Sequence, residues 1–270
     1  MRTLVHLSDL HFGRTDDAVL EPLLTAVAGA RPDVVVVSGD LTQRAKTGEF
    51  EAARRFLDRL PRPQIVVPGN HDVPLYRIWE RFLNPLGKYQ RLIAAELEPS
   101  FVDAEIAVIG INTARSLTFK NGRINKEQMA TIHRHLDPLP ESVTKVVVTH
   151  HPFDLPDQEG ELELVGRARK AMQVFSDCGV DLLLAGHFHT SEAGETSAHH
   201  QIAGYSALVV QAGTATSTRG RGEQNSFNVL RVKSDEIEIE RREWQPASGA
   251  FVTAALERFV RSGERWIESS

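Results

Sequence analysis

The feature of this sequence that most constrains its fold is a series of short runs of Val, Ile and Leu in its first two thirds. Most of these runs are nearly continuous and do not alternate with polar residues, which is typical of strands buried on both faces of a sheet. Sheets of this kind are covered by helices, so the runs predict an α/β fold. The six predicted strands are residues 3–7, 34–37, 64–67, 106–111, 145–148 and 182–184.

Segments with helical character separate these runs. Asp16 and Asp17 suit the start of a helix because they are acidic, and Thr47 suits an N-cap. The segment 73–98 is also helical in character but is interrupted by Pro74, Pro85 and Gly87, which predicts a helical excursion beside the main fold. The other predicted helices cover residues 16–30, 47–60, 124–136 and 163–178.

The last third of the chain has a different pattern. Residues 207–211, 227–232 and 236–242 are predicted as strands, and Ser234-Asp235 lies between two of them as the turn of a hairpin. Residues 251–260 are interpreted as an amphipathic helix. Because no repeat or linker is apparent, we expect one domain over residues 1–270, with the excursion at about 73–98 and a C-terminal hairpin plus helix at about 227–262.

Length and charge narrow the class of function. A chain of 270 residues buries a full core without disulfides or a structural metal, so a bound metal would serve chemistry. The net charge of -5 argues against a nucleic-acid partner, which usually needs a basic surface. No apolar run approaches the length of about 20 residues that spans a bilayer, so we expect a cytoplasmic protein with no membrane partner. The oligomeric state stays open.

Metal-ligating residue types follow five of the six predicted strands. In α/β sheets, sites form at the carboxyl ends of strands, so we expect these residues to converge at one edge. The segments are Asp9-Leu10-His11, Gly39-Asp40, Gly69-Asn70-His71-Asp72, His150-His151 and Gly186-His187-Phe188-His189.

The residue types suit transition metals. Imidazole and carboxylate together bind Fe, Mn, Zn or Co and leave positions open for water and substrate. In an extended segment, residues two apart share a side, so we expect Asp9 to lie beside His11 and His187 beside His189. Each motif alone is weak evidence, whereas all five in this order point to a metal centre.

The combined motifs resemble the calcineurin-like metallophosphoesterase superfamily. Within it, Ser8-Asp9-Leu10-His11-Phe12-Gly13, Gly69-Asn70-His71-Asp72-Val73 and Thr149-His150-His151-Pro152 resemble the bacterial class III cyclic nucleotide phosphodiesterases and glycerophosphodiesterases. The resemblance implies a four-layer αββα sandwich with two metal ions, Fe, Mn, Zn or Co, at the carboxyl ends of the strands.

The resemblance also implies a role for each residue. Asp9, His11 and His189 would hold the first metal, and Asn70, His150 and His187 the second. Asp40 would bridge the two metals. His71 would bind no metal and would assist the leaving group as a proton donor or electrostatic stabiliser. His151 would lie behind the ligands.

The function implied is hydrolysis of a small phosphodiester, a cyclic nucleotide or a glycerophosphodiester, by a hydroxide that bridges the two metals. Two alternatives keep the same site: a phosphomonoesterase and a nuclease. A third is a scaffold on this fold without catalysis. Arg115, Arg219, Arg221 and Asn225 are the further candidates for substrate contacts.

Overall fold

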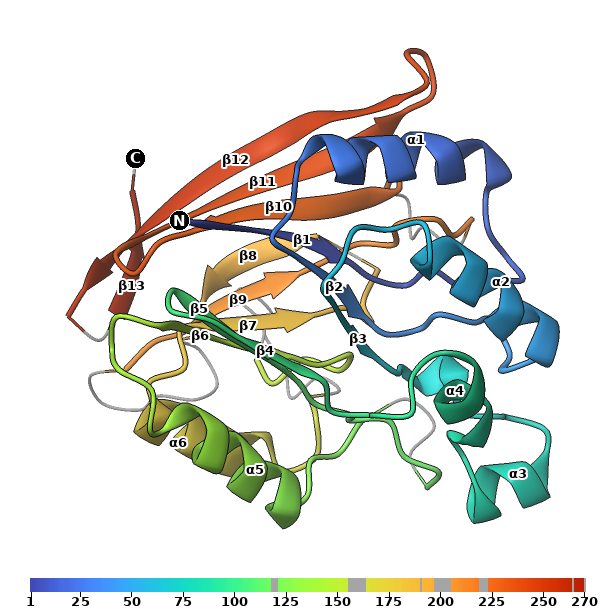
Figure 1. The fold of residues 1–270 in the computed structure, drawn as a ribbon, viewed down its shortest axis with the longest axis horizontal. Coiled ribbons are helices and arrows are strands. Elements are labelled where there is room, and N and C mark those ends of the chain that lie inside the picture. Colours follow the sequence, from blue (N-terminus) through green and yellow to red (C-terminus); the bar gives the residue numbers. More distant parts are fainter. Residues whose placement is uncertain are drawn as a thin grey trace.

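Two β-sheets pack face to face in the computed structural model, and helices cover both outer faces (Figure 1). The structure describes residues 1–117, 121–154, 164–189, 191–196, 205–218, 223–263 and 265–269. The arrangement is the four-layer αββα sandwich that the family resemblance implied. Within these ranges, none of the helices is long and apolar enough to cross a bilayer.

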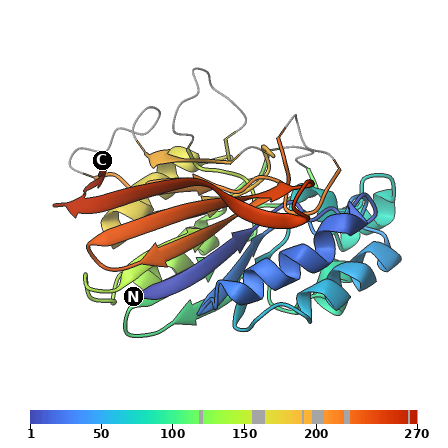
Figure 2. The same ribbon diagram turned by 90° about the horizontal axis from the view of Figure 1, so that it is seen from above.

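The first sheet has the strand order β13-β12-β11-β10-β1-β2-β3 in the described part of the chain. Strands β1, β2 and β3 are parallel, and β10 to β13 form an antiparallel meander that joins the sheet beside β1 (Figure 2). The bounds are β1 (Arg2–Leu7), β2 (Val34–Ser38), β3 (Gln64–Val67), β10 (Ser226–Val232), β11 (Glu236–Gln245), β12 (Ala250–Ser262) and β13 (Arg265–Glu268).

The second sheet has the order β4-β5-β6-β7-β9-β8 over the same described ranges. Its four central strands are parallel, and the two edge strands run antiparallel to their neighbours. The bounds are β4 (Ser100–Val102), β5 (Ile106–Gly110), β6 (Thr144–Val148), β7 (Leu182–Ala185), β8 (Glu192–Glu195) and β9 (Leu208–Gln211).

The helices bury their apolar faces against the sheets. Helices α1 (Asp17–Gly29) and α2 (Thr47–Leu57) cover the first sheet, and α5 (Lys126–Leu136) and α6 (Ala168–Cys178) cover the second. The carboxylate of Asp16 caps α1 by accepting the Ala18 N–H at 3.0 Å. The segment after β3 contains a 3-10 helix, η1 (Asn70–Asp72), and the short helices α3 (Ile78–Leu83) and α4 (Gly87–Leu92).

Strand β2 shows why the apolar runs are continuous. Val35 and Val37 face the helices, whereas Val34 and Val36 face the other sheet. All four are fully buried. Burying one such side chain contributes about 1.5–3 kcal/mol, so neither face tolerates a polar residue. The six strands predicted from such runs are all present within one or two residues, three in each sheet.

The helix predicted at residues 251–260 is wrong, because this segment is the middle of β12. It pairs with β11 along its length, and Ala254 forms a bulge opposite Arg241 and Arg242. The extra residue shifts the inward positions, so that Phe251 packs under the helices and Phe259 between the sheets. The bulge therefore disrupts the period-two alternation by which a strand is recognised in a sequence.

Glu240 of β11 links three strands and generates a stability prediction. Its carboxylate accepts hydrogen bonds from Arg242 at 2.8 Å, Arg231 at 3.0 Å and Thr253 at 2.6 Å. Burial acts to raise the pKa of Glu240, but these three donors lower it to about 2. We expect Glu240→Gln to lower the free energy of unfolding by about 1–3 kcal/mol at pH 7, measured by urea unfolding.

The effect of Glu240→Gln should depend on pH. Because the folded-state pKa lies below the ordinary value of 4.5, the carboxylate stabilises the protein above about pH 4.5 and loses this contribution as the pH falls toward 2. The two proteins should thus become more alike in acid. Glu236→Gln is the control, because that side chain is 42% exposed and, among the described residues, pairs with Lys233 alone, at 3.4 Å. Equal stability of Glu240→Gln and the parent at pH 7 would contradict the prediction.

Candidate metal centre

The residues predicted at the strand ends come together at one end of the sandwich. The first sheet supplies side chains that follow β1, β2 and β3, and the second supplies side chains that follow β6 and β7. They therefore approach from both sheets across the interface, whereas the sequence indicated only a common edge. In chain order they are Asp9, His11, Asp40, Asn70, His71, His150, His187 and His189.

Three buried side chains form a first cluster, here called the Asp9 group: Asp9, His11 and His189. Asp9 Oδ1 lies 3.4 Å from His11 Nε2 and 3.6 Å from His189 Nδ1. None of these three atoms has a hydrogen-bond partner among the described residues, which is costly for buried polar atoms. Ligands bound at about 2.0–2.2 Å to one ion stand about 3.0–3.6 Å apart, so the group fits a metal ion.

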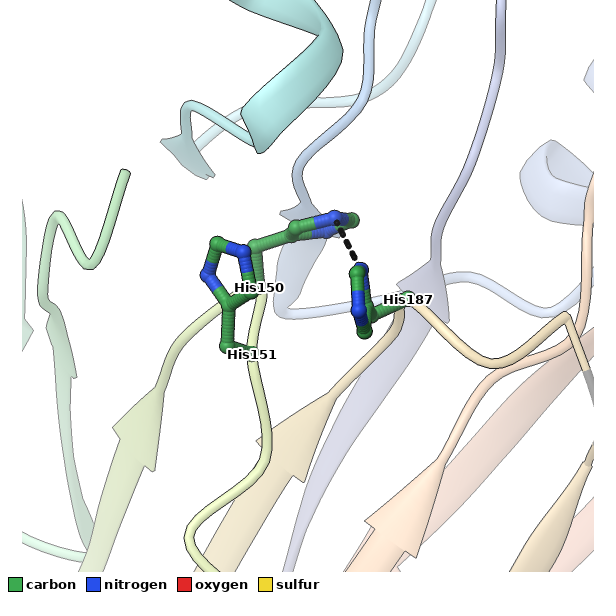
Figure 3. A group of neighbouring side chains, drawn as sticks. All are labelled: His150, His151 and His187. Atoms are coloured by element: carbon green, nitrogen blue, oxygen red, sulfur yellow. Dashed lines mark hydrogen bonds between the residues drawn. The ribbon is translucent and has the colours of Figure 1, made fainter. Parts of the chain in front are cut away.

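A second cluster, the Asn70 group, lies beside the first and contains Asn70, His150 and His187. Asn70 Oδ1 is 3.1 Å from His150 Nε2 and 3.2 Å from His187 Nδ1. The two ring nitrogens are 3.3 Å apart and point toward one another (Figure 3). One oxygen and two nitrogens at this spacing are again a set that a transition-metal ion suits.

Asp40 joins the two groups through a single oxygen. Its Oδ2 is 3.3 Å from His150 Nε2 of the Asn70 group and 3.7 Å from His11 Nε2 of the Asp9 group. Its other oxygen, Oδ1, accepts the backbone N–H of His71 at 2.8 Å. The carboxylate is thus fixed at the boundary of the two groups, where it faces both.

The adjacent histidines 150 and 151 differ in orientation. The Nδ1–H of His150 donates to the Ser38 carbonyl at 2.8 Å, which directs its Nε2 toward Asp40 and Asn70. His151 Nδ1 instead shares a hydrogen bond of 2.8 Å with Thr113 Oγ1. This geometry favours His150 over His151 as the residue that faces a metal.

The buried charges favour a cation in the cluster. Burial acts to raise the pKa of Asp40, but the neighbouring His150 and His71 hold it well below its usual range. Burial acts in the opposite direction on His150, yet Asp40 raises the pKa of that ring to about 9. Burial, reinforced by His150, lowers the pKa of His187 to about 4. Two buried carboxylates therefore stabilise positive charge at the centre of a histidine cage.

His71 lies beside both groups but is held by other contacts. Its Nδ1 is 2.9 Å from the Gln43 carbonyl oxygen, which fixes the ring as an Nδ1–H donor. The ring meets that of His11 edge-on, with centroids 4.9 Å apart. His71 is therefore a half-buried imidazole whose ring contacts His11 of the Asp9 group.

The Asp-x-His and His-x-His pairs do not lie on extended segments, so that part of the sequence argument is wrong. Instead, their residues adopt left-handed backbone conformations: φ is 53° at Asp9, 47° at His11, 80° at His187 and 62° at His189. Asp40 also has a positive φ, 51°. Such values are uncommon outside glycine and cluster at functional sites, where the surrounding contacts hold them.

Glycine is required where these loops approach one another. A Cβ at Gly69 would overlap the Asp40 carboxylate. A Cβ at Gly39, whose φ is +95°, would lie 2.6 Å from His150 Nδ1. The glycines in these motifs therefore let Asp40 and His150 lie close to the neighbouring loops.

Asp72 supports the centre in a way that the sequence argument missed. Its buried carboxylate accepts backbone N–H groups of Leu41, Thr42 and Gly69 at 3.1, 2.9 and 2.9 Å, which ties the loop after β2 to the loop after β3. Burial and the nearby Asp40 raise the pKa of Asp72 to about 6. The position of Asp72 in the Gly-Asn-His-Asp motif is the sequence feature that could have identified it as a supporting residue.

Three further donors support Asp9. Ser8 Oγ donates to Asp9 Oδ2 at 2.6 Å, and the His187 backbone N–H donates to the same oxygen at 3.1 Å. Thr214 Oγ1 donates to the Asp9 carbonyl at 2.8 Å. Thr214 lies 205 residues along the chain from Asp9, and no local pattern marks it.

Two candidate substrate contacts, Arg115 and Asn225, are held by hydrogen bonds within the chain, and the other two lie outside the described residues. The guanidinium of Arg115 donates to the carbonyls of Asn112 and Ala114 and to Gln128 Oε1, at 3.0, 2.8 and 2.6 Å. These bonds tie Arg115 to the first turn of α5. Asn225 donates to the carbonyls of Thr214 and Ser217. Arg219 and Arg221 are outside the described residues.

Curated relatives share parts of this chain. The glycerophosphodiester phosphodiesterase GpdQ of Enterobacter lignolyticus is 37% identical over 81 residues, which are 26% of this chain and 29% of GpdQ. A probable glycerophosphodiester phosphodiesterase GpdQ of Arcobacter nitrofigilis is 24% identical over 59% of this chain and 57% of that protein. A probable cyclic nucleotide phosphodiesterase of Synechococcus sp. is 23% identical over 69% of this chain and 73% of its own. The match thus spans less than two thirds of either GpdQ protein.

Solved structures share the fold. A purple acid phosphatase from yellow lupin (Lupinus luteus) seeds superposes with a TM-score of 0.70 at 12% identity, over 93% of this chain and 52% of that one. The structure of PhoD superposes with a TM-score of 0.70 at 10% identity, over 100% of this chain and 71% of that one. At such identities the likeness concerns the fold alone.

The model of the calcineurin-like phosphoesterase family matches residues 2–191. This range contains all eight residues of the candidate centre, from Asp9 to His189, and covers most of the chain. Its Asp and His side chains form the kind of clusters that hold two metals. The chain therefore belongs to the calcineurin-like phosphoesterases.

Proposed function

We propose that this protein is a dinuclear metal-dependent phosphodiesterase that hydrolyses a small phosphodiester, a cyclic nucleotide or a glycerophosphodiester. The observation that carries the proposal is the position of Asp40 Oδ2, which lies 3.3 Å from His150 Nε2 and 3.7 Å from His11 Nε2. One carboxylate oxygen shared by two three-residue groups is the arrangement that a pair of metal ions needs. Two ions about 3.5–4 Å apart are typical of hydrolases that act on phosphate esters.

Each donor group would hold one ion. The Asp9 group would bind the first and the Asn70 group the second, with Asp40 bridging both. Fe, Mn, Zn and Co all suit sets of imidazole nitrogens and carboxylate oxygens. Bound there, the ions would lower the pKa of a shared water and neutralise phosphoryl oxygens.

The protein's own groups would then orient the reaction. Ser8 and the backbone N–H of His187 hold Asp9 Oδ2, which leaves Asp9 Oδ1 for the centre. His71, held through its Nδ1 by the Gln43 carbonyl, would donate a proton to the leaving oxygen or stabilise charge there. No covalent attachment of substrate to a side chain is required.

A diester is proposed over a monoester because three of the matched relatives are named as enzymes of glycerophosphodiesters or cyclic nucleotides. The net charge of -5 argues against the nuclease alternative, since a nucleic-acid groove usually needs a basic field. The complete donor set argues against a scaffold without catalysis. A phosphomonoesterase with this site is the main competitor.

The first prediction of the proposed function concerns metal content and substrate class. The purified chain loaded with Mn²⁺ should bind about two metal ions and cleave bis-p-nitrophenyl phosphate faster than p-nitrophenyl phosphate. Elemental analysis and release of p-nitrophenolate measure the two quantities. Faster cleavage of the monoester would retain the centre but change the function to that of a phosphatase. Labelled DNA and RNA as substrates test the nuclease alternative.

The second prediction concerns Asp40. Asp40→Ala should lower kcat/KM for the diester by about 100-fold or more and reduce the bound metal below two ions, because both groups lose a shared ligand. Asp177→Ala is the matched control, since Asp177 is exposed near the end of α6, which leads into the start of β7 and not into its carboxyl end. Full activity in Asp40→Ala would exclude the bridging role.

The third prediction concerns His71. His71→Ala should keep the parent metal content and lower kcat by about 10²–10⁴-fold on diesters with poor leaving groups. The loss should shrink as the leaving phenol becomes more acidic, since a good leaving group needs no proton. Rates for a series of aryl diesters measure this slope. His133→Ala, on the outer helix α5 and half-exposed, is the control. A loss that is uniform across the series would contradict proton donation.

A further inference from the structure

A cluster of large apolar side chains is exposed in the excursion after η1 and is here called the apolar tip. It contains Leu75, Tyr76, Ile78, Trp79, Phe82 and Leu83, which are 44%, 71%, 64%, 81%, 52% and 77% exposed. Single exposed apolar residues are common on protein surfaces, but six within nine positions are not. Such a cluster indicates a surface that meets a partner.

The short helix α3 within the tip is inverted relative to an ordinary surface helix. Arg81 is 3% exposed, and its Nη1 donates to the Pro74 carbonyl at 3.1 Å. Glu80 accepts from Lys88 at 2.7 Å and from Arg77 at 2.6 Å. Arg81 of α3 is thus held against the protein, whereas Trp79, Phe82 and Leu83 face solvent. This is the reverse of the usual amphipathic pattern.

The apolar tip lies at the metal-centre end of the molecule. Figure 1 shows α3 at the outer corner, beyond α4 and away from the four layers, on the side toward which β1 and β2 run. The Arg44 guanidinium stacks over the Tyr76 ring at 5.4 Å. Gln43, the preceding residue, accepts the Nδ1–H of His71. The tip is therefore connected to the rim of the candidate centre.

The charged residues around the tip indicate the charge of its partner. Residues 73–92 contain four basic residues and one acidic residue, although the whole chain has a net charge of -5. Exposed basic residues lie in this segment, at Arg77 and Arg91, and in the loop that holds Arg44 over Tyr76, at Arg44 and Lys46. In a two-fold pairing of two tips, these like charges would lie close to one another, which opposes a second copy as the partner. An anionic partner would instead be attracted to these cations.

We propose that the apolar tip docks onto an anionic lipid surface. Trp79, Phe82 and Leu83 would enter the boundary between headgroups and acyl chains, where tryptophan is favoured, and the flanking cations would contact lipid phosphates. We expected no membrane partner because the sequence contains no segment long enough to span a bilayer. A contact of six side chains at the membrane surface needs no such segment. The proposal does not depend on which phosphoester the centre cleaves.

Trp79 offers a direct readout. The chain has three tryptophans, and the other two, Trp244 and Trp266, are 8% and 1% exposed. The full chain mixed with vesicles of phosphatidylcholine and phosphatidylglycerol should show a blue shift of tryptophan emission and should sediment with them. Vesicles of phosphatidylcholine alone should bind less, and raising NaCl from about 0.1 to 1 M should weaken the binding, because salt screens the cations.

A double variant tests the surface itself and keeps the reporter. Phe82→Ser with Leu83→Ser should weaken vesicle binding by about tenfold or more, because apolar area is lost from the contact. Leu256→Ser on β12, which removes a 52% exposed leucine elsewhere, should bind vesicles like the parent. Thermal unfolding and metal content, unchanged in both variants, would show that the fold and the centre are intact.

Three results would overturn the proposal. The first is unshifted tryptophan emission with anionic vesicles, and the second is equal binding by the parent and the double variant. The third is a blue shift that grows with protein concentration without lipid, accompanied by a doubled mass in light scattering, which would assign the tip to a second copy of the chain. Lipid-dependent binding that the double variant loses and Leu256→Ser keeps would support it.

Discussion

Two buried carboxylates, those of Asp9 and Asp40, impose the constraint that organises this end of the molecule. Both are almost completely withdrawn from solvent at the end of an apolar sandwich. Buried charge is costly unless it is compensated, and here the compensation comes from a cage of histidines and from the N–H and O–H donors of the loops. That cage leaves Asp9 Oδ1 and His11 Nε2 without hydrogen-bond partners in the described part of the chain. Bound cations would coordinate these two atoms and compensate the buried negative charge.

The αββα architecture makes such a cage possible. Each sheet is covered on both faces, so the loops at its carboxyl end project from a rigid base. Positive φ angles at Asp9, His11 and Asp40 turn these side chains toward one another, and the side chains of Asp72 and Thr214 hold the loops through hydrogen bonds to the backbone. Strain in the loops is tolerated because the strands beneath them are fully buried and do not yield.

The apolar tip places a second surface beside this centre. Its residues follow the Gly-Asn-His-Asp loop directly, so the segment that supplies Asn70 and His71 also carries Trp79 and Leu83. A lipid contact there would hold the end of the molecule that contains the candidate centre close to the membrane surface. The two features remain separable, because one rests on buried polar groups and the other on exposed apolar ones.

The sequence by itself determined the buried strands and the identity of the residues that follow them. Burial on both faces leaves a continuous apolar run, and metal-ligating residue types after such runs are visible without a structure. Only the tertiary structure decided how the strands divide between two sheets, which left-handed turns bring Asp9 to His11, and that residues 251–260 form a bulged strand. It also decided the support by Thr214 and the outward orientation of Trp79. These depend on contacts between residues far apart in the chain, whereas local periodicity reports only on near neighbours.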